Sequence, residues 1–448
     1  MKKRFSLPTW IPTLLVAAVI YFVVRYANQT EAITHYWYQV IEFAAILAIS
    51  ALGLNLIYGF NGQFSLGHVG FYAIGAYSSA LITKDFGRKP WSGDPVGALS
   101  WMMAAQLGIL LVLVAFRVSH LGELRRRMRT GLSGWLKPHE ASMITTVLTL
   151  VVSAAIFVAG YYATIGLHWM AYRLLTALFA AVPENVGTGL NFFLAIVNGG
   201  TIAALASYLV GLPLLRLGSD YFGIATLGFA VMVYTALQNS DTVISTMKGA
   251  RGMVGIPPLT TWNWAFGALV IGTIVMRNLI RSSHGRAIIS VREDEIAART
   301  MGIDVAQQKA VAFTIGGFYA GVAGALFAHL YGFLHPSSFN FIKGFDPLII
   351  IVFGGLGSMT GTIVAAVGYA LLLEGLRVLL PQGFEDWRFV IYPLLLLAVM
   401  LLRQEGLLGT KEWGWLRAPL PPEREIPVPQ RALAAQNGGN VDEEAQHG

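Results

Sequence analysis

The chain of 448 residues contains no cysteine. This absence excludes disulfide bonds, thiolate metal sites and cysteine nucleophiles. Charged residues are also scarce, at 12% of the sequence, whereas soluble domains carry about 25%. Hydrophobic residues make up 55%. The composition therefore excludes an ordinary soluble domain.

Motifs for nucleotide binding and catalysis are missing as well. No Gly-Lys pair occurs, so the chain cannot form a Gly-x-x-x-x-Gly-Lys phosphate-binding loop. His139-Glu140 has no second histidine at zinc-protease spacing, and the remaining histidines are scattered. No spacing indicates a Ser–His–Asp triad. We expect a protein that is not an enzyme and that holds no metal and no cofactor of its own.

Long apolar runs are present instead. Runs of about 18 or more residues recur along the chain, which predicts an all-α, polytopic helical membrane protein with about ten to twelve transmembrane helices. Gly-rich stretches interrupt some of them. Residues 1–37 should form an N-terminal anchor span and 38–402 a transmembrane domain. Residues 403–448 are Pro-, Gln- and Gly-rich and should form a largely disordered tail.

The basic residues give the orientation. Met1-Lys-Lys-Arg4 precedes the first apolar run, which favours an uncleaved span with a cytoplasmic N-terminus. The cluster at 125–129 is the densest basic loop and should also face the cytoplasm, whereas Lys248 and Arg251 would face outward and count against this topology. An even number of crossings places both termini in the cytoplasm. The net charge of +7 is interpreted as topology and membrane-lipid contact, and not as nucleic-acid binding.

The most densely charged segment runs from Arg281 to Lys309. Acidic residues open a predicted short helix at about 292–301, Arg299 lies near its end, and Gly302 follows. This order suits the helix dipole and a left-handed C-terminal cap. Glu295 and Arg299 lie one turn apart and can pair. Such a helix can dock on another protein, or it can be a solvated loop helix.

Three stretches combine glycines with polar residues at membrane depth. They contain the candidates for a polar path, because buried amides and broken helices need partners or water. Asp220 has an alternative role as a helix cap, and the glycines could instead line a helix–helix seam. The candidates are Asn55, Asn61, Gln63, Ser65, His68, Asp220, Thr226, Gly354 and Gly357.

These stretches carry a resemblance. Glu295-Ile-Ala-Ala-Arg-Thr-Met-Gly302 resembles the cytoplasmic Glu-Ala-Ala…Gly loop of ABC importer permeases. The fuller string from Gly285, together with the stretches at 53–77, 219–229 and 354–361, is similar to the LivM branch of the branched-chain amino acid permease family. The resemblance covers about 51–409, apart from 84–188, which departs from the family as an insertion with about two extra spans.

The resemblance implies an ATP-driven importer for branched-chain or related amino acids in the bacterial inner membrane. Its partners would be a LivH-like second permease, two ABC ATPase subunits that bind ATP and Mg, and a periplasmic substrate-binding protein. The loop at 281–309 would be the cytoplasmic coupling loop. The residues that would contact the ATPase are Arg292, Glu293, Asp294, Glu295, Ala297, Ala298, Arg299 and Gly302.

Other functions stay open. A related permease could carry urea, an amide, or an aromatic or other organic acid. A stand-alone secondary transporter would need an inverted repeat and buried carboxylates, and the sequence offers little sign of either. A membrane enzyme or scaffold is disfavoured by the missing catalytic pattern.

Overall fold

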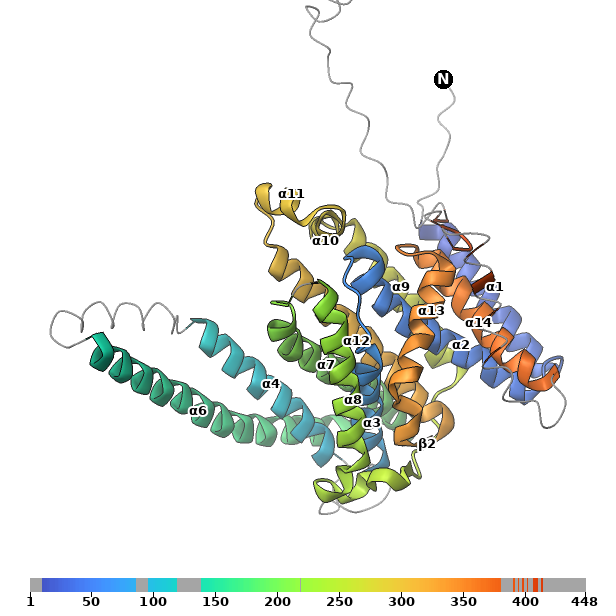
Figure 1. The fold of residues 1–448 in the computed structure, drawn as a ribbon. Coiled ribbons are helices and arrows are strands. Elements are labelled where there is room, and N and C mark those ends of the chain that lie inside the picture. Colours follow the sequence, from blue (N-terminus) through green and yellow to red (C-terminus); the bar gives the residue numbers. More distant parts are fainter. Residues whose placement is uncertain are drawn as a thin grey trace, which may run out of the picture.

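The computed structural model describes residues 10–85, 96–118, 138–217 and 219–379, with shorter pieces at 390, 394, 397–398, 401, 406–409 and 412–413. The described residues are almost entirely helical (Figure 1). The first half contains α1 (Trp10–Gln29), α2 (His35–Leu54), the π-helix η1 (Asn55–Phe60), α3 (His68–Asp85), α4 (Gly97–Val118) and α6 (Pro138–Ala181). The second half contains α7 (Glu184–Leu214), α8 (Ser219–Gln238), α9 (Trp262–Arg281), α10 (Ser283–Glu293), α11 (Glu295–Thr300), α12 (Val305–Tyr331), α13 (Phe345–Gly354) and α14 (Met359–Leu379).

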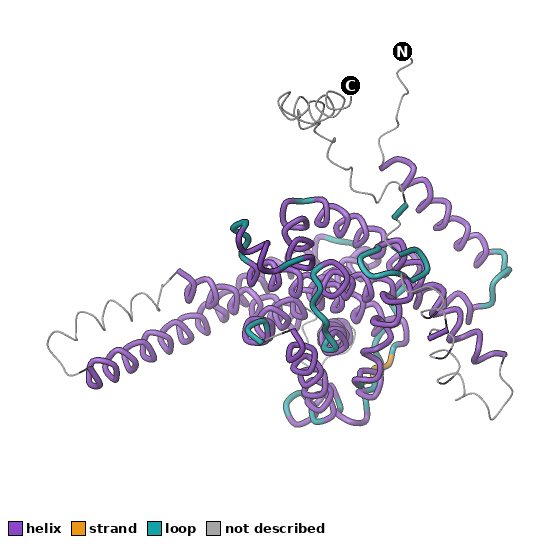
Figure 2. The backbone as a smooth tube through the Cα atoms, turned by 45° about the horizontal axis from the view of Figure 1, so that its top comes forward, coloured by secondary structure: helices purple, strands orange, loops and turns teal. Residues whose placement is uncertain are grey.

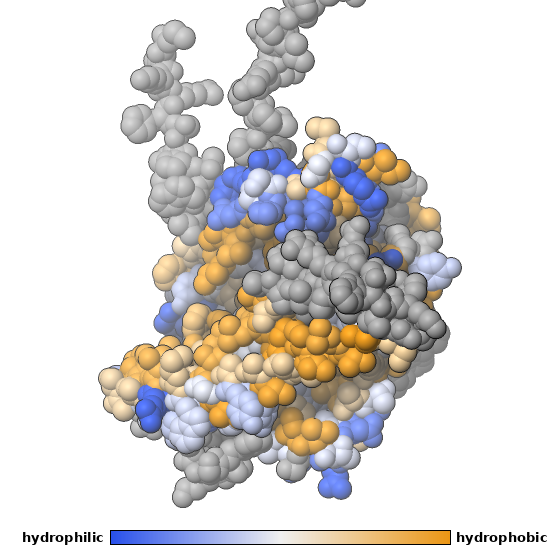
Figure 3. Space-filling view, turned by 90° about the vertical axis from the view of Figure 1, so that its left-hand side faces the viewer, coloured by the Kyte–Doolittle hydropathy of each residue, from blue (hydrophilic) through white to orange (hydrophobic). Residues whose placement is uncertain are grey.

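The predicted membrane character is confirmed. Within the described residues, nine helices are long and apolar enough to cross a bilayer. One face of the molecule shows hydrophobic residues gathered in a central band, with hydrophilic residues above and below it (Figure 3). The predicted span at about 387–402 lies almost wholly outside the described residues.

Helix α12 forms the centre of the bundle and packs against α2, α3 and α7. Small residues permit this close packing. A Cβ at Gly324 would lie 1.9 Å from the carbonyl oxygen of Tyr72, and one at Gly75 would lie 2.2 Å from that of Gly321. The glycines of α3 and α12 therefore act as a packing seam, as in other membrane bundles.

Two connections within the bundle lack regular helix. After η1, residues 61–67 run through the bundle to the start of α3. Helices α13 and α14 are separated by a four-residue break at 355–358, where Gly355 and Gly357 adopt positive φ angles of 114° and 83°. The glycine break expected between two apolar segments is therefore present. Whether the two segments are short crossings or a re-entrant element stays a prediction, because α13 has 10 residues.

The end of the bundle opposite α10 and α11 is made of short elements. It contains β1 (Met253–Val254) and β2 (Phe333–Leu334), which pair antiparallel with Met253 opposite Leu334. The 3₁₀ turns there are η2 (Ser240–Thr242), η3 (Ser245–Met247), η4 (Gly249–Arg251), η5 (Pro336–Phe339) and η6 (Phe341–Gly344).

The predicted insertion contains a long hairpin. Helices α4 and α6 contact each other and project side by side from the bundle (Figures 1 and 2). We expected a span at about 142–162 followed by a separate interfacial segment at 167–182. The structure instead has one continuous helix, α6, of 44 residues. No proline interrupts this sequence after Pro138, so nothing local ends the helix.

Candidate functional site

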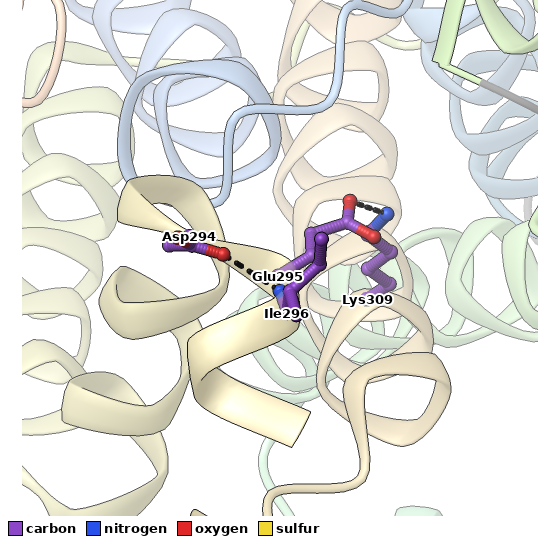
Figure 4. Close-up of polar contacts among 4 residues, drawn as sticks. All are labelled: Asp294, Glu295, Ile296 and Lys309. Carbon is purple, nitrogen blue, oxygen red and sulfur yellow. Dashed lines mark hydrogen bonds and ion pairs between the residues drawn. The ribbon is translucent and has the colours of Figure 1, made fainter. Parts of the chain in front are cut away.

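The loop between α9 and α12 folds into two short helices that meet at Asp294. One carboxylate oxygen of Asp294, Oδ1, accepts a hydrogen bond from the backbone N–H of Ile296 at 2.8 Å (Figure 4). The same oxygen accepts a second bond, from the backbone N–H of Ala297 at 3.0 Å. These are free N–H groups of the first turn of α11, so Asp294 is its N-cap. The predicted helix is present, but it begins at Glu295 because Asp294 ends α10.

Gly302 ends α11 as predicted. Its φ of 82° is left-handed. The N–H of Gly302 donates to the carbonyl of Arg299 and that of Ile303 to the carbonyl of Ala298, both at 3.1 Å. These two bonds form a Schellman motif. Short helices are marginal alone, so the caps at both ends fix α11 in place.

The inner face of α11 differs from the predicted one. Ala298 was expected on the docking face, but its side chain is buried against Val291, Val305 and Ile303 of the same chain. Val291 of α10, Ala298 of α11 and Val305 of α12 form one small apolar cluster where the three helices meet. The exposed large side chains are instead Ile296 (77%) and Met301 (81%).

The predicted pair between Glu295 and Arg299 does not form. Glu295 pairs with Lys309, in the first turns of α12 (Figure 4). The turn at Gly302 folds α11 back against α12, which brings Lys309 to Glu295. Arg299 and Glu293 stay exposed. The outer face of α11 therefore combines two apolar side chains with charged neighbours.

Arg292 is an exposed residue whose guanidinium reaches back to the bundle. Its Nη1 donates to the carbonyl of Gly59, the fifth residue of η1. A Cβ at Gly62 would lie 3.3 Å from Cγ of Arg292, and one at Gly357 would lie 2.9 Å from its Nη1. The guanidinium therefore lies between η1 and the break at 355–358.

Asn55 joins the same two elements. Its Nδ2 donates to the carbonyl of Ser358 (3.0 Å) and to Oγ1 of Thr362 (2.9 Å), and its Oδ1 accepts from the N–H of Gly357 (2.9 Å). The side chain is fully buried, so Asn55 holds the two elements together. We call Asn55, Gly59, Arg292 and Gly357 the junction.

The break is packed by protein on its other side. A Cβ at Gly354 would lie 2.5 Å from the backbone of Gly361. The Glu412 carboxylate accepts from the N–H groups of Met359 (2.5 Å) and Thr360 (3.3 Å), at the start of α14. The tail was expected to be largely disordered, but residues 406–409 and 412–413 pack on the break. A carboxylate at a helix N-terminus is a favourable contact that the tail composition does not reveal.

The polar candidates in residues 61–68 divide into two groups. Thr226 accepts a hydrogen bond from the N–H of Leu66 (3.1 Å), and Ser65 accepts one from the N–H of Gly67 (3.4 Å), so both hold the segment's backbone. Asn61, Gln63 and His68 are buried, and each has a side-chain atom without a partner among the described residues. Asp220 lies in the first turn of α8, and its side chain is outside the described part of the structure.

Sequence reasoning did not select Lys309, Lys343, Asp346 or Glu412. Lys343 and Asp346 form an i,i+3 ion pair with 3.5 Å between Nζ and Oδ2. Their spacing, just before an apolar run, was a signal that could have identified them.

Comparison with known proteins places the chain in a family. The family model described as branched-chain amino acid transport system / permease component matches residues 37–400. The high-affinity branched-chain amino acid transport system permease protein LivM of Salmonella typhimurium is 33% identical over 254 residues. That alignment covers 49% of this chain and 58% of the relative, so the chain spans little more than half the length of the LivM relatives.

Two other relatives match different shares of the chain. The permease protein LivH of Escherichia coli is 24% identical over 380 residues, covering 83% of this chain and 94% of LivH. The autoinducer 2 import system permease protein LsrC of Enterobacter sp. is 28% identical, covering 50% of this chain and 66% of LsrC. No solved structure gives a significant match. The family match over most of the chain and the ordered motifs agree: this polytopic membrane protein belongs to the permease component family of branched-chain amino acid transport systems.

Proposed function

We propose that this chain is a transmembrane permease subunit of an ATP-driven importer for branched-chain or related amino acids, in the bacterial inner membrane. Its α10–α11 loop docks on an ATPase subunit, which binds ATP and Mg. The other partners are a LivH-like second permease, a second ATPase subunit and a periplasmic substrate-binding protein.

One observation carries the proposal: the outer face of α11. Ile296 and Met301 are large, apolar and exposed at the end of the bundle where Arg292, Glu293 and Arg299 also lie. Exposed apolar side chains on a rigid element with charged neighbours are typical of a docking surface. The two caps hold α11 in one orientation, so little order is lost on binding.

The junction supports the mechanical part of the proposal. Arg292 lies two residues before Asp294 and contacts η1 and the break between α13 and α14. A displacement of α11 would therefore act on η1 and on the break at 355–358. Packed elements with two discrete arrangements are a common basis for such switching.

The proposal also fixes the orientation of the chain in the membrane. Helix α1 begins on the same side of the molecule as α10 and α11 (Figure 1). If α11 meets an ATPase, that side is cytoplasmic, and α1 begins there, in agreement with the expected cytoplasmic N-terminus. The expected even number of crossings would place the C-terminus there too.

The experiment is reconstitution in proteoliposomes with the four partner components. Leucine uptake should require ATP and every ATPase subunit. Ile296→Asp and Met301→Asp should reduce co-purification of the ATPase. Val243→Asp is the matched control, because Val243 is 84% exposed at the opposite end of the bundle.

Two outcomes would contradict the proposal. Uptake by this chain without ATPase subunits would indicate a secondary transporter. ATP-dependent uptake of urea, an amide or an organic acid, without uptake of any amino acid, would keep the permease role and reject the substrate class. The likeness to LsrC, which is named for a different solute, makes this comparison informative.

A further inference from the structure

A cavity of about 380 Å³ lies between α2, α3, α12, α13 and α14. Tyr331, at the end of α12, lines it. Helix α12 begins beside α11 and spans 27 residues, or about 40 Å. The cavity therefore lies toward the end of the bundle opposite the α10–α11 loop. Its size suits a small-molecule ligand.

The cavity contains charges of both signs. Lys343 and Asp346 line it and form their ion pair there, with side chains 44% and 14% exposed. The Tyr369 hydroxyl donates to Oδ1 of Asp346 (2.8 Å) and fixes this carboxylate. Lys343 is the more accessible partner, so a competing anion can reach its ammonium.

His68 supplies an unused acceptor at the inner part of the cavity. Its Nε2 lies 2.8 Å from the carbonyl oxygen of Ser50. A carbonyl can only accept, so Nε2 carries the proton and Nδ1 presents a lone pair. His68 is 1% exposed, and no donor among the described residues reaches Nδ1. A buried acceptor of this kind calls for a donor from a ligand or water.

A second carboxylate, Glu374 of α14, also lines the cavity and is paired with Arg377. An apolar wall is formed by Phe43 and Leu47 of α2, Phe327 of α12 and Leu373 of α14. The site thus offers the Asp346 carboxylate and a neutral acceptor for a positive group, the Lys343 ammonium for a negative group, and an apolar surface beside them.

We propose that this cavity binds a zwitterionic α-amino acid with a bulky aliphatic side chain. Asp346 and Nδ1 of His68 accept hydrogen bonds from the ammonium, Lys343 pairs with the carboxylate, and the aliphatic group packs on the apolar wall. The inference rests on the proposed function and adds a binding site within the permease itself. Neither the family match nor the relatives' names assign one.

The test uses ligands that lack one group at a time. The complete permease–ATPase complex is placed in phosphatidylcholine nanodiscs, without the substrate-binding protein or ATP. Phosphatidylcholine has no primary ammonium that would imitate the ligand. Binding of L-leucine is compared with 4-methylpentanoate, which lacks the ammonium, 3-methylbutylamine, which lacks the carboxylate, and glycine, which lacks the aliphatic group.

Leucine should bind more tightly than each of the other three, by about tenfold for each missing charged group. Asp346→Asn should abolish the preference for leucine over 4-methylpentanoate, and Lys343→Gln the preference over 3-methylbutylamine. Arg251→Gln is the control, because Arg251 is exposed in η4 and does not line the cavity. Each preference is a ratio measured on one preparation, so partial loss of folded protein cancels.

The possible outcomes distinguish an error in the ligand assigned to the cavity from an error in the proposed function. If leucine does not bind, or both preferences survive in the variants, while the full complex still imports leucine with ATP, the cavity assignment is wrong and the proposed function stands. If the complex imports no amino acid at all, the proposed substrate class fails, and the ligand assigned to the cavity fails with it.

Discussion

At the residue scale, a substitution at Glu295 can separate an effect on ATPase docking from an effect on folding. Its pair with Lys309 is partly exposed, so its loss should cost less than about 1 kcal/mol of folding free energy. We predict that Glu295→Lys lowers leucine uptake in the reconstituted complex while insertion and thermal stability stay nearly unchanged. The Glu295→Lys/Lys309→Glu double variant restores the pair inside the chain. Recovery of uptake in that variant would mean that Glu295 acts only through Lys309.

Arg292 should transmit motion within the chain. We predict that Arg292→Ala retains ATP hydrolysis but lowers leucine uptake per ATP by about tenfold, because one charge-assisted hydrogen bond is lost. Arg292→Lys should recover part of the ratio. The ratio is measured by following both reactions on the same proteoliposomes.

The control for Arg292 is Arg286→Ala. Arg286 lies on the same helix, and its Nη1 donates to the carbonyl of Arg281 at 2.9 Å, away from the junction. Its removal should leave the ratio unchanged. A parallel fall of ATPase activity and uptake in Arg292→Ala would show that Arg292 supports docking and not transmission.

Local rules were enough to predict the C-terminal end of α11, and they explain its N-terminal end. Asp294 and Gly302 have residue types that cap helices, and both act through backbone atoms close in sequence. The burial of Ala298 depends on how α10, α11 and α12 fold back on one another, and the contact of Arg292 depends on η1, which is distant in sequence. A single helix pattern does not contain that information, so it predicted neither the burial of Ala298 nor the bond from Arg292 to Gly59.

At the element scale, Asn55 joins η1 to the break between α13 and α14. We predict that Asn55→Leu lowers the stability of the purified protein by at least about 2 kcal/mol, because it leaves the N–H of Gly357 and the carbonyl of Ser358 buried with fewer partners. Asn239→Leu is the control, because Asn239 is exposed and bonds only locally, to the carbonyl of Thr235. Its effect should stay within about 0.5 kcal/mol. Equal thermal shifts in the two variants would contradict the role of Asn55.

The helix breaks could be predicted from glycine content, but their surroundings could not. Gly354 and Gly357 were considered beside a polar path. The structure instead packs the break against Gly361, Asn55 and Glu412. A buried break satisfies its backbone groups as well as a wet one, so composition alone cannot distinguish the two.

At the scale of the whole molecule, the absence of cysteine makes the orientation testable. A single Met301→Cys or Val243→Cys variant is the only thiol in the chain, and both positions are highly exposed. We predict that a membrane-impermeant maleimide labels Met301→Cys only in inside-out vesicles, and Val243→Cys only in spheroplasts. The reverse pattern would place α11 on the outer face and reject docking on a cytoplasmic ATPase.

In the proposed complex, the long hairpin would limit where a neighbouring subunit can bind. Helix α6 has 44 residues and is about 66 Å long, roughly twice the thickness of the hydrocarbon core. It must lie strongly tilted in the bilayer or extend beyond it. In either case α4 and α6 together occupy a wide area of the membrane on one side of the bundle. A neighbouring subunit cannot occupy that area without meeting the hairpin first. The complex would then be asymmetric, because the α4–α6 hairpin occupies one side of this chain and the partner subunits would bind on the opposite side.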